Sequence, residues 1–477
     1  MTTTAMQGLQ LIFDQQEAIG GIIADIKAGS ARVVLCGYAG TGKTVTTAAL
    51  VNELTEIGMN VVVATPTHKA RAQVERALRE RGAYGFDCVT IHRLLGLKMN
   101  RDFKTGKESF QPDSKGRNMI KEGIWEEEYN AKRKVDVVIV DETSMVSSEL
   151  YAILLGELRL THGQSLPVVF VGDDRQLLPV GEETVSPAFV EARSIYRLTK
   201  VLRHDGAILN LATATRELSV GRASFASAVG GGTRVIAYKS RHEWREALLD
   251  MADTEEAMED PDYCRALAWT NSSVEELNTC IHERRFGLNA PQFKTGMVCV
   301  TCDAIPDPIG GSPLLHSTVD VLIDYAALDE WSAPCESPGQ LPLIPDMTQE
   351  DPFKVWELEL KVYEDDGPAV HVRVLAREEE NRWKESQKRI AEAAKSANSS
   401  ADSKYLWRLF YQRKDQIGRI EPASALTIHK SQGSTFRHVF LHWSIDGWGS
   451  APTAQQNQLA YVGITRAAES LHVVADR

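Results

Sequence analysis

The chain has 477 residues, 43% of them hydrophobic and 25% charged, and its formal net charge at pH 7 is -12. This length predicts about three domains with large hydrophobic cores, and the composition is typical of a globular protein. The charge excludes a surface coated with basic residues, although one cationic groove for nucleic acid is compatible with it.

Signals for membranes and secretion are missing from the sequence pattern. No apolar run approaches the roughly 18 residues of a membrane span, and the first residues lack the basic and apolar regions of a signal peptide. We therefore expect an intracellular, cytoplasmic protein with no membrane partner.

A glycine loop at residues 37–44 reads Gly-Tyr-Ala-Gly-Thr-Gly-Lys-Thr, between an apolar run at 33–36 and a helical pattern at 45–57. Strand, glycine loop and helix in this order are typical of a P-loop that binds a nucleoside triphosphate. Glycines allow backbone N–H groups to surround phosphate oxygens, lysine reaches the β- and γ-phosphates, and threonine offers a hydroxyl to Mg²⁺. The predicted binding residues are Gly37, Gly40, Thr41, Gly42, Lys43 and Thr44.

A second apolar run, at residues 137–140, ends on two acidic residues, Asp141 and Glu142. A carboxylate at the end of another strand completes the magnesium site of P-loop proteins, so Asp141 is the predicted metal ligand. Glu142 is the predicted base that orients water for hydrolysis. The alternative is a simple glycine turn and an ordinary strand end, which would have to occur in this order by chance.

Strand and helix patterns alternate through the first third of the chain. Apolar runs at residues 33–36, 61–64, 137–140 and 168–171 predict a parallel sheet covered by helices on both faces. We expect a first α/β domain at residues 1–96 and 135–190. Residues 97–134 interrupt it, and their pattern predicts a β-hairpin followed by a helical stretch.

A second α/β pattern covers residues 191–285 and 421–477, with strands expected at 265–269, 439–441 and 471–474. Residues 286–420 interrupt it with short β runs between Gly/Pro-rich turns, which indicate a small β-barrel. A charged helix at 376–397 leads into a Ser/Ala tract, for which we expect a loop. Cys299 and Cys302 form a C-x-x-C pair, and we favour structural thiols over a metal site because no recognised spacing supplies two more ligands.

Several further segments resemble, in order, the motifs of superfamily 1 helicases. The likeness is greatest to the RecD-like (5′-3′) branch and, within it, to the Dda-like helicases of phages. The matching segments are residues 11–18 (Q motif), 64–70 (Ia), 90–93 (Ib), 172–180 (III), 198–203 (IV), 425–433 (V) and 460–467 (VI). The inserts at 97–134 and 286–420 match in position more than in letters.

The resemblance implies a role for particular side chains around the nucleotide. Gln15 would bond adenine, with Gln16 as a competing choice, and Gln176 would lie beside the γ-phosphate. Arg203 and Arg466 would approach the triphosphate from the second domain and stabilise transition-state charge. Gly433 would contact the nucleotide. The implied catalytic set is Lys43, Glu142, Gln176, Arg203 and Arg466.

The resemblance also implies contacts to a single strand, made through short hydroxyl and imidazole donors to phosphates without base readout. Taken alone, each motif could equally be a turn or a helix cap. In the hairpin, Phe103 or Phe110 would stack on the last base pair of a duplex, or would be a packing residue. The strand-contacting candidates are Thr65, Pro66, Thr67, His68, Lys69, Thr90, His92, Phe103, Phe110, Thr270, Asn271, Thr427, His429 and Ser431.

The fold implied by the resemblance is α/β: two RecA-like P-loop parallel-sheet domains, with a β-hairpin insert in the first and an SH3-like β-barrel with a helical extension in the second. The implied function is an ATP-dependent DNA helicase that uses Mg²⁺, moves 5′ to 3′ on single-stranded DNA and unwinds duplex. Its expected partners are single-stranded DNA, fork duplex, and replication or recombination proteins. We expect it to act as a monomer in a bacterial cytoplasm or in that of a phage host.

Two other functions stay open. A P-loop NTPase acting on a small molecule would share Lys43, Thr44 and Asp141, but would have no reason to carry motifs III, V and VI. A single-strand translocase or binding scaffold would not unwind duplex. The intact Lys43, Glu142, Gln176 and Arg466 argue against a scaffold without turnover.

Overall fold

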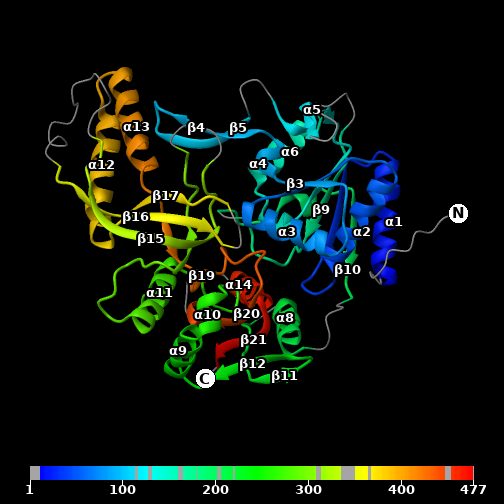
Figure 1. The fold of residues 1–477 in the computed structure, drawn as a ribbon. Helices are drawn as coiled ribbons and strands as arrows, with labels where there is room; N and C mark the ends of the chain where they lie inside the picture. Colours follow the sequence, from blue (N-terminus) through cyan, green and yellow to red (C-terminus); the bar gives the residue numbers. More distant parts are fainter. Residues whose placement is uncertain are drawn as a thin grey trace.

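The computed structural model describes residues 11–112, 117–126, 131–159, 165–179, 181–200, 206–218, 221–307, 313–334, 350–363, 367–445 and 453–475. Figure 1 shows three main sheets in separate parts of the molecule: one at the blue N-terminal end, one in green and red, and one in yellow. None of the helices in the described part of the chain combines the length and apolar character of a membrane span.

The first sheet is six-stranded, with the order β10-β1-β9-β8-β2-β3, and every neighbouring pair is parallel. The strands are β1 (Arg32–Gly37), β2 (Val61–Thr65), β3 (Phe86–Thr90), β8 (Val137–Val140), β9 (Val168–Gly172) and β10 (Ser194–Leu198). The helices that accompany them are α1 (Phe13–Lys27), α2 (Lys43–Glu56), α3 (His68–Glu80), α4 (Ile91–Leu94), α6 (Ser148–Arg159) and α7 (Pro187–Val190), with a 3-10 turn η1 (Thr143–Met145). We call this unit the first domain.

Both faces of the first sheet are covered, because successive strand residues point to opposite sides. Val33 and Leu35 of β1 belong to a core with α1 and α2, whereas Val34 and Cys36 belong to a core with α6. The parallel sheet expected from the four apolar runs is therefore confirmed. The expected domain end at residue 190 falls before β10, which pairs with β1 in this sheet.

The second sheet has the order β11-β12-β21-β20-β13-β19 and is parallel except for the pair β11 and β12. Its strands are β11 (Ala228–Gly230), β12 (Thr233–Tyr238), β13 (Cys264–Ala268), β19 (Ala425–Thr427), β20 (Phe436–Leu441) and β21 (Ala467–Val474). On one face lie α8 (Ala207–Glu217) and α14 (Thr453–Thr465). On the other face lie α9 (Arg241–Ala252), α10 (Glu255–Glu259) and α11 (Asn271–Phe286). We call this unit the second domain.

A third sheet, inserted into the second domain, is antiparallel with the order β17-β16-β15-β14-β18. Its strands are β14 (Val298–Thr301), β15 (Asp320–Trp331), β16 (Phe353–Val362), β17 (Val370–Leu375) and β18 (Ile420–Pro422). Two antiparallel helices, α12 (Glu380–Ser396) and α13 (Ser400–Asp415), extend from it. We call the sheet and these helices the insert. The loop expected in the Ser/Ala tract was wrong from residue 400 onward, where α13 begins.

The expected hairpin in the first domain consists of β4 (Leu97–Asp102) and β5 (Lys107–Pro112). The rest of the described segment forms α5 (Met119–Glu122) and a short ribbon of β6 (Ile124–Glu126) and β7 (Ala131–Arg133), so the helical stretch expected there is only one turn. Figure 1 shows the hairpin reaching across to α13. At its tip Gly106 has φ of 66°, and a Cβ there would lie 2.3 Å from the Trp407 ring, so only glycine fits.

Candidate nucleotide and strand sites

The glycine loop between β1 and α2 has a backbone suited to phosphate. Gly40 and Gly42 have φ values of 81° and 82°, which residues with side chains rarely adopt. Gly42 is also the N-cap of α2, so amide groups of the first helical turn open toward the loop. The Nζ atom of Lys43 donates to the carbonyl oxygens of Gly37, at 2.7 Å, and Tyr38, at 3.2 Å. An arriving triphosphate can replace these two carbonyls.

Gln15 lies against this loop. Its side chain is fully buried, and its Nε2 atom lies 3.4 Å from the carbonyl oxygen of Thr41. Its Oε1 atom accepts a hydrogen bond from the amide of Ile12. The competing Gln16 instead bonds the Leu11 carbonyl on an exposed surface. The contact with adenine predicted for Gln15 stays a prediction.

Asp141 and Thr44 fit a magnesium site. Asp141 follows β8, two strands from β1 in the sheet, and is 8% exposed. Burial and the neighbouring Glu142 raise the pKa of Asp141. The charge of Lys43 acts on Asp141, but among the described residues no lysine or arginine forms an ion pair with it, so a divalent ion could neutralise this buried carboxylate. Thr44, in the first turn of α2, can add a hydroxyl ligand.

Glu142 has a strained backbone. Its φ of 52° lies in the left-handed region, shared among the described non-glycine residues only with Thr318. Such strain costs free energy and is concentrated at functional sites. A Cβ built on Gly433 of motif V would lie 3.8 Å from Oε1 of Glu142 and 3.2 Å from Oε1 of Gln73 on α3. The predicted base of the first domain therefore faces the second domain.

Motif III lies directly beside the segment that follows β8 and carries Asp141 and Glu142. The hydroxyl of Ser144 in η1 donates to Oε1 of Gln176 at 3.5 Å, and both side chains are buried. Asp173, from the same motif, accepts a hydrogen bond from the amide of Arg175. Arg203 of motif IV lies outside the described residues, so its predicted role stays a prediction.

Two contacts join the domains at the glycine loop. The hydroxyl of Tyr461 on α14 donates to Oδ2 of Asp173 at 2.7 Å and accepts from the amide of Ala39 at 3.0 Å. The guanidinium of Arg216 on α8 lies 3.8 Å from the ring centroid of Tyr38 in a cation-π contact. Tyr461 occurs in the motif VI segment but had no predicted role, and nothing in the local sequence singled out Arg216.

Arg466, the predicted arginine of motif VI, is 8% exposed and bonds groups of its own domain. Its Nε donates to the Val462 carbonyl at 3.2 Å, and NH1 donates to the Ser434 carbonyl at 2.9 Å. The guanidinium of Arg466 therefore lies near motif V in this structure. Its predicted contact with a triphosphate stays a prediction.

Motifs Ia and Ib are neighbours at the carboxyl ends of adjacent strands. Thr65 of β2 and Thr90 of β3 are register partners. Thr67 caps α3 by accepting from the Ala70 amide at 3.2 Å, and Thr90 caps α4 in the same way. The cap uses an acceptor lone pair of the hydroxyl and leaves its hydrogen available to a phosphate. Pro66 lies between Thr65 and Thr67 in the sequence, and His68 and Lys69 are the first two residues of α3.

Motif V and the Thr270-Asn271 pair form the matching group in the second domain. Their strands, β13 and β19, are parallel neighbours, with Ala268 opposite Thr427. Thr270 caps α11, of which Asn271 is the first residue, and Thr427 accepts from the Lys430 amide at 3.2 Å. His429 and Ser431 follow, and the Ser431 hydroxyl is committed to the Ile428 carbonyl.

The hairpin is held by α13 of the insert. Arg101 makes a two-pronged ion pair with Asp415, at 2.5 and 2.6 Å, and the Tyr411 hydroxyl donates to the Gly106 carbonyl at 3.0 Å. Phe103 packs edge-on against Tyr411. Phe110 is 43% exposed and lies edge-on to His92 of motif Ib. Of the two predicted wedge residues, Phe110 therefore lies closer to the predicted strand contacts.

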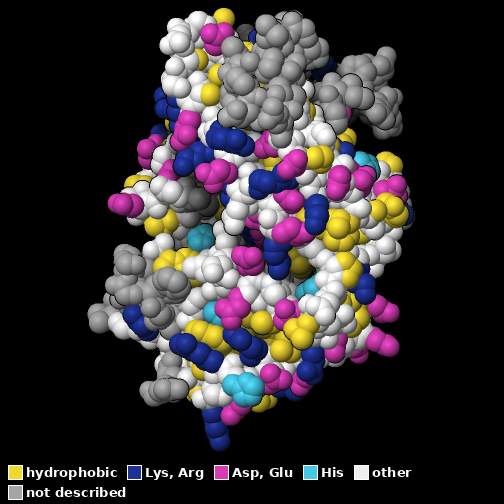
Figure 2. All heavy atoms as spheres, turned by 90° about the vertical axis from the view of Figure 1, so that its left-hand side faces the viewer, with side chains coloured by type: hydrophobic (Ala, Val, Ile, Leu, Met, Phe, Trp, Pro, Cys, Tyr) yellow, Lys and Arg dark blue, Asp and Glu magenta, His cyan; other side chains and the backbone are white. Residues whose placement is uncertain are grey.

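The described part of the outer face of the insert offers no comparable site. Figure 2 shows Lys and Arg side chains interspersed with Asp and Glu over the described atoms of that face, without a continuous basic strip. A phosphate backbone needs a run of cationic or donor groups. The predicted strand contacts instead occupy the strand ends of the two parallel sheets.

The C-x-x-C pair lies in the insert. Burial raises the pKa of both thiols, to about 12 for Cys302, so they are protonated at neutral pH. In the described part of the chain, no group of three His, Cys, Asp or Glu side chains is placed to hold a metal ion. Structural thiols remain the better interpretation.

Comparison with known proteins agrees with this geometry. The family model of the AAA domain matches residues 10–238, and that of the UvrD-like helicase C-terminal domain matches residues 422–474. The ATP-dependent DNA helicase Dda of Enterobacteria phage T4 is 26% identical over 466 residues, which cover 95% of this chain and 96% of Dda. RecD, the RecBCD enzyme subunit of Mycobacterium tuberculosis, is 30% identical over 50% of this chain, but that match spans only 39% of RecD.

Among solved structures, the Pif1 helicase from Bacteroides in complex with ADP-AlF3 and ssDNA aligns over 98% of this chain and 94% of its own. The sequence identity is 15% and the TM-score is 0.48. Three observations point to the same family. They are the order of the motifs, their location around one domain interface, and the likeness to Dda along nearly the whole chain. These matches support a superfamily 1 helicase of the RecD and Dda type.

Proposed function

We propose that this chain is an ATP-dependent DNA helicase that moves 5′ to 3′ along single-stranded DNA and separates duplex. The observation that carries the proposal is the junction at the glycine loop, where Tyr461 bonds both Ala39 and Asp173. A nucleotide bound at this loop touches the boundary of two domains, and each domain carries its own group of strand contacts. Binding and hydrolysis then alternately favour closed and open arrangements of the two grips.

Each residue of the nucleotide site has its own role in binding or hydrolysis. Lys43 and the loop amides bind the phosphates, while Thr44 and Asp141 would hold Mg²⁺, which offsets phosphate charge when bound. Glu142 orients the attacking water, and Gln176 contacts the segment that carries Asp141 and Glu142 through Ser144. Arg466, with Arg203, would stabilise the transition state from the second domain. Because both halves of the site come from one chain, we propose that a monomer is active.

The hairpin would split the duplex, with Phe110 as the wedge and the insert as its support. We also propose that the five antiparallel strands of the insert form an SH3-like barrel, because all five contribute side chains to one apolar core. A rigid wedge transfers the force of translocation to the base pairs, whereas a mobile hairpin would yield. Fork duplex is thus the proposed substrate, in a replication or recombination setting.

The test compares ATP hydrolysis with and without single strands, and opening of duplexes that carry a 5′ or a 3′ tail, made of DNA or RNA. We expect DNA to stimulate hydrolysis, only the 5′-tailed DNA duplex to open, and Lys43→Ala to abolish both with an unchanged melting temperature. An NTPase acting on a small molecule would show no stimulation by strands. A translocase or scaffold would bind strands and open neither duplex.

A further inference from the structure

One carboxylate of the insert connects all three parts of the chain. Asp320, the first residue of β15, accepts from Nζ of Lys69 on α3 of the first domain at 3.3 Å. Its other oxygen accepts from NH2 of Arg265 on β13 of the second domain at 3.1 Å. The side chains of Lys69, Asp320 and Arg265 are 11%, 17% and 1% exposed, so water screens these pairs only weakly.

The two partners of Asp320 are not held equally. Arg265 also donates to the Ala423 carbonyl and lies over the Phe436 ring, with its guanidinium carbon 5.4 Å from the ring centroid. Lys69 has no second hydrogen-bond partner among the described residues. Lys69 can therefore leave without stranding the carboxylate, because Arg265 remains to neutralise it.

The neighbouring residue of motif Ia is covered from the same segment of the insert. The ring of His316 stacks on that of His68, with centroids 3.2 Å apart and planes 7° apart. Burial and the facing His316 lower the pKa of His68 to about 4, and burial lowers that of His316 as well. Both rings are therefore neutral at pH 7. Two consecutive residues predicted to grip phosphate are thus both occupied by the insert.

We propose that Asp320 and His316 form a placeholder that occupies the phosphate grip of motif Ia until a DNA strand displaces it. This inference rests on the proposed function, since it assigns a regulator to the same strand site. A phosphate can take the place of the Asp320 carboxylate on Lys69, exchanging one anion for another. The DNA strand must compete with the Asp320 carboxylate for Lys69. Without DNA, the insert therefore stays docked on the first domain.

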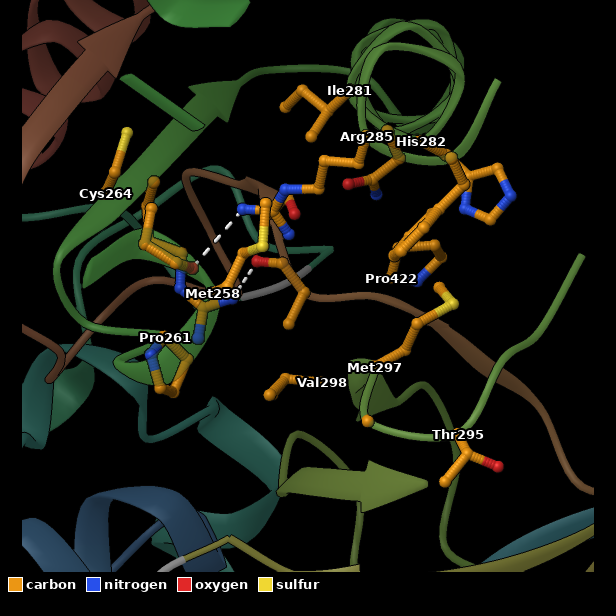
Figure 3. Close-up of a pocket in the computed structure, with 17 residues that line it drawn as sticks. Met258, Pro261, Cys264, Ile281, His282, Arg285, Thr295, Met297, Val298 and Pro422 are labelled. Carbon is orange, nitrogen blue, oxygen red and sulfur yellow. Dashed lines mark hydrogen bonds between the residues drawn. The ribbon is translucent and has the colours of Figure 1, made fainter. Parts of the chain in front are cut away.

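The joint between the insert and the second domain leaves room for the undocking. A cavity of about 140 Å³ lies where the chain enters and leaves the insert. Figure 3 shows Ile281 and Arg285 of α11 on one side of it. Met297 and Val298, at the start of β14, and Pro422, at the end of β18, line it from the insert. The pocket marks the joint about which the insert would rotate away from the first domain.

The test is the affinity for a fluorescein-labelled oligodeoxythymidylate, measured by anisotropy without nucleotide. In Asp320→Asn the side chain keeps its shape and can still accept from Arg265, but no longer neutralises Lys69. We expect it to bind the strand about threefold to tenfold more tightly than the wild type, as for one partly buried ion pair. Asp324→Asn is the matched control. This variant removes the same charge from the same β-strand, β15, where Asp324 is paired with Lys361. Its affinity for the oligonucleotide should stay within about twofold of that of the wild type.

His316→Ala supplies an independent arm that leaves the ion pairs intact. His316→Ala should also bind the oligonucleotide more tightly than the wild type. Thermal melting reports whether each variant folds, and if Asp320→Asn does not fold, the affinity of His316→Ala decides the question. Equal or weaker binding by the folded variants would show that the contacts merely brace motif Ia and would overturn the inference. A wild type that binds no strand at all would instead overturn the proposed function, and the inference with it.

Discussion

The hydroxyl of Tyr461 lies 2.7 Å from a carboxylate oxygen of Asp173, so one phenol of the second domain bonds the loop that follows β9 in the first. The phenol oxygen of Tyr461 also accepts a hydrogen bond from the amide of Ala39 in the glycine loop. Burial raises the pKa of Tyr461 far above its usual range, so the phenol stays protonated and can donate. A single side chain of the second domain thus contacts both segments that surround a bound triphosphate.

Replacing Tyr461 by Phe should weaken the coupling of the two domains. The change removes two hydrogen bonds but keeps the ring, a loss of about 1–3 kcal/mol. We expect kcat/KM for strand-stimulated ATP hydrolysis to fall about tenfold. Tyr238→Phe is the control, since it removes another partly buried phenol hydroxyl of the same domain, bonded to His472. Equal rates in the wild type and Tyr461→Phe would show that the contact has no part in turnover.

Breaking the support of the hairpin should separate unwinding from hydrolysis. Arg101→Gln removes the two-pronged pair with Asp415 that fixes β4 to α13. We expect duplex opening to fall at least about fivefold and strand-stimulated hydrolysis to stay within about twofold, because partly buried ion pairs of this kind contribute on the order of 1 kcal/mol. Arg284→Gln, which breaks an exposed pair with Asp250, is the control. Parallel losses of both activities would argue against a wedge at this hairpin.

The two hairpin aromatics should behave differently. Phe110 is exposed beside His92, so Phe110→Ala should impair strand separation with little change in melting temperature. Phe103 packs on Tyr411, so Phe103→Ala should lower the melting temperature by loosening the hairpin from α13. Strand-separation rates and thermal melts of both variants check this. The reverse pattern would exchange the roles of wedge and anchor.

The second domain should lose stability in mild acid. Burial lowers the pKa of His472 to about 3 and that of His442 to about 4, against about 6.5 in the unfolded chain. Below pH 6.5 only the unfolded state takes up these protons, so the free energy of unfolding falls as pH falls. Each histidine should remove about 2 kcal/mol between pH 7.5 and pH 5. Urea unfolding across this range checks the slope, and a stability that is flat or rises toward pH 5 would contradict it.

The nucleotide site was the most predictable part of the molecule, because its residues are contiguous in the sequence. The glycine loop, Asp141 and Glu142 follow directly from apolar runs that form β1 and β8. Contacts between distant segments had no local signal. Arg216 meets Tyr38 only once α8 is placed against the glycine loop, and Asp320 meets Lys69 only because the insert folds back onto α3.

The insert was the least predictable part of the fold. Ser399 in the Ser/Ala tract caps α13 by accepting from the Asp402 amide at 3.0 Å, so residues that suggested a loop begin a helix. The buried Leu406 and Trp407 then pack that helix against α12. Serine favours both loops and helix N-caps, and tertiary packing decides between them. The location of β10 beyond residue 190 has a similar cause, since its pairing with β1 is set by the sheet.

The central claim is that Lys43 from one domain binds the triphosphate, while Arg466 from the other domain stabilises the transition state of its hydrolysis. Steady-state hydrolysis by Arg466→Lys and Arg466→Ala, at saturating single-stranded DNA, tests it most directly when the affinity for a fluorescent ATP analogue is measured beside it. We predict that kcat falls about 10³-fold or more while nucleotide affinity changes less than about fivefold, as expected for a group that acts on the transition state. A kcat within about tenfold of the wild type in folded protein would contradict the claim.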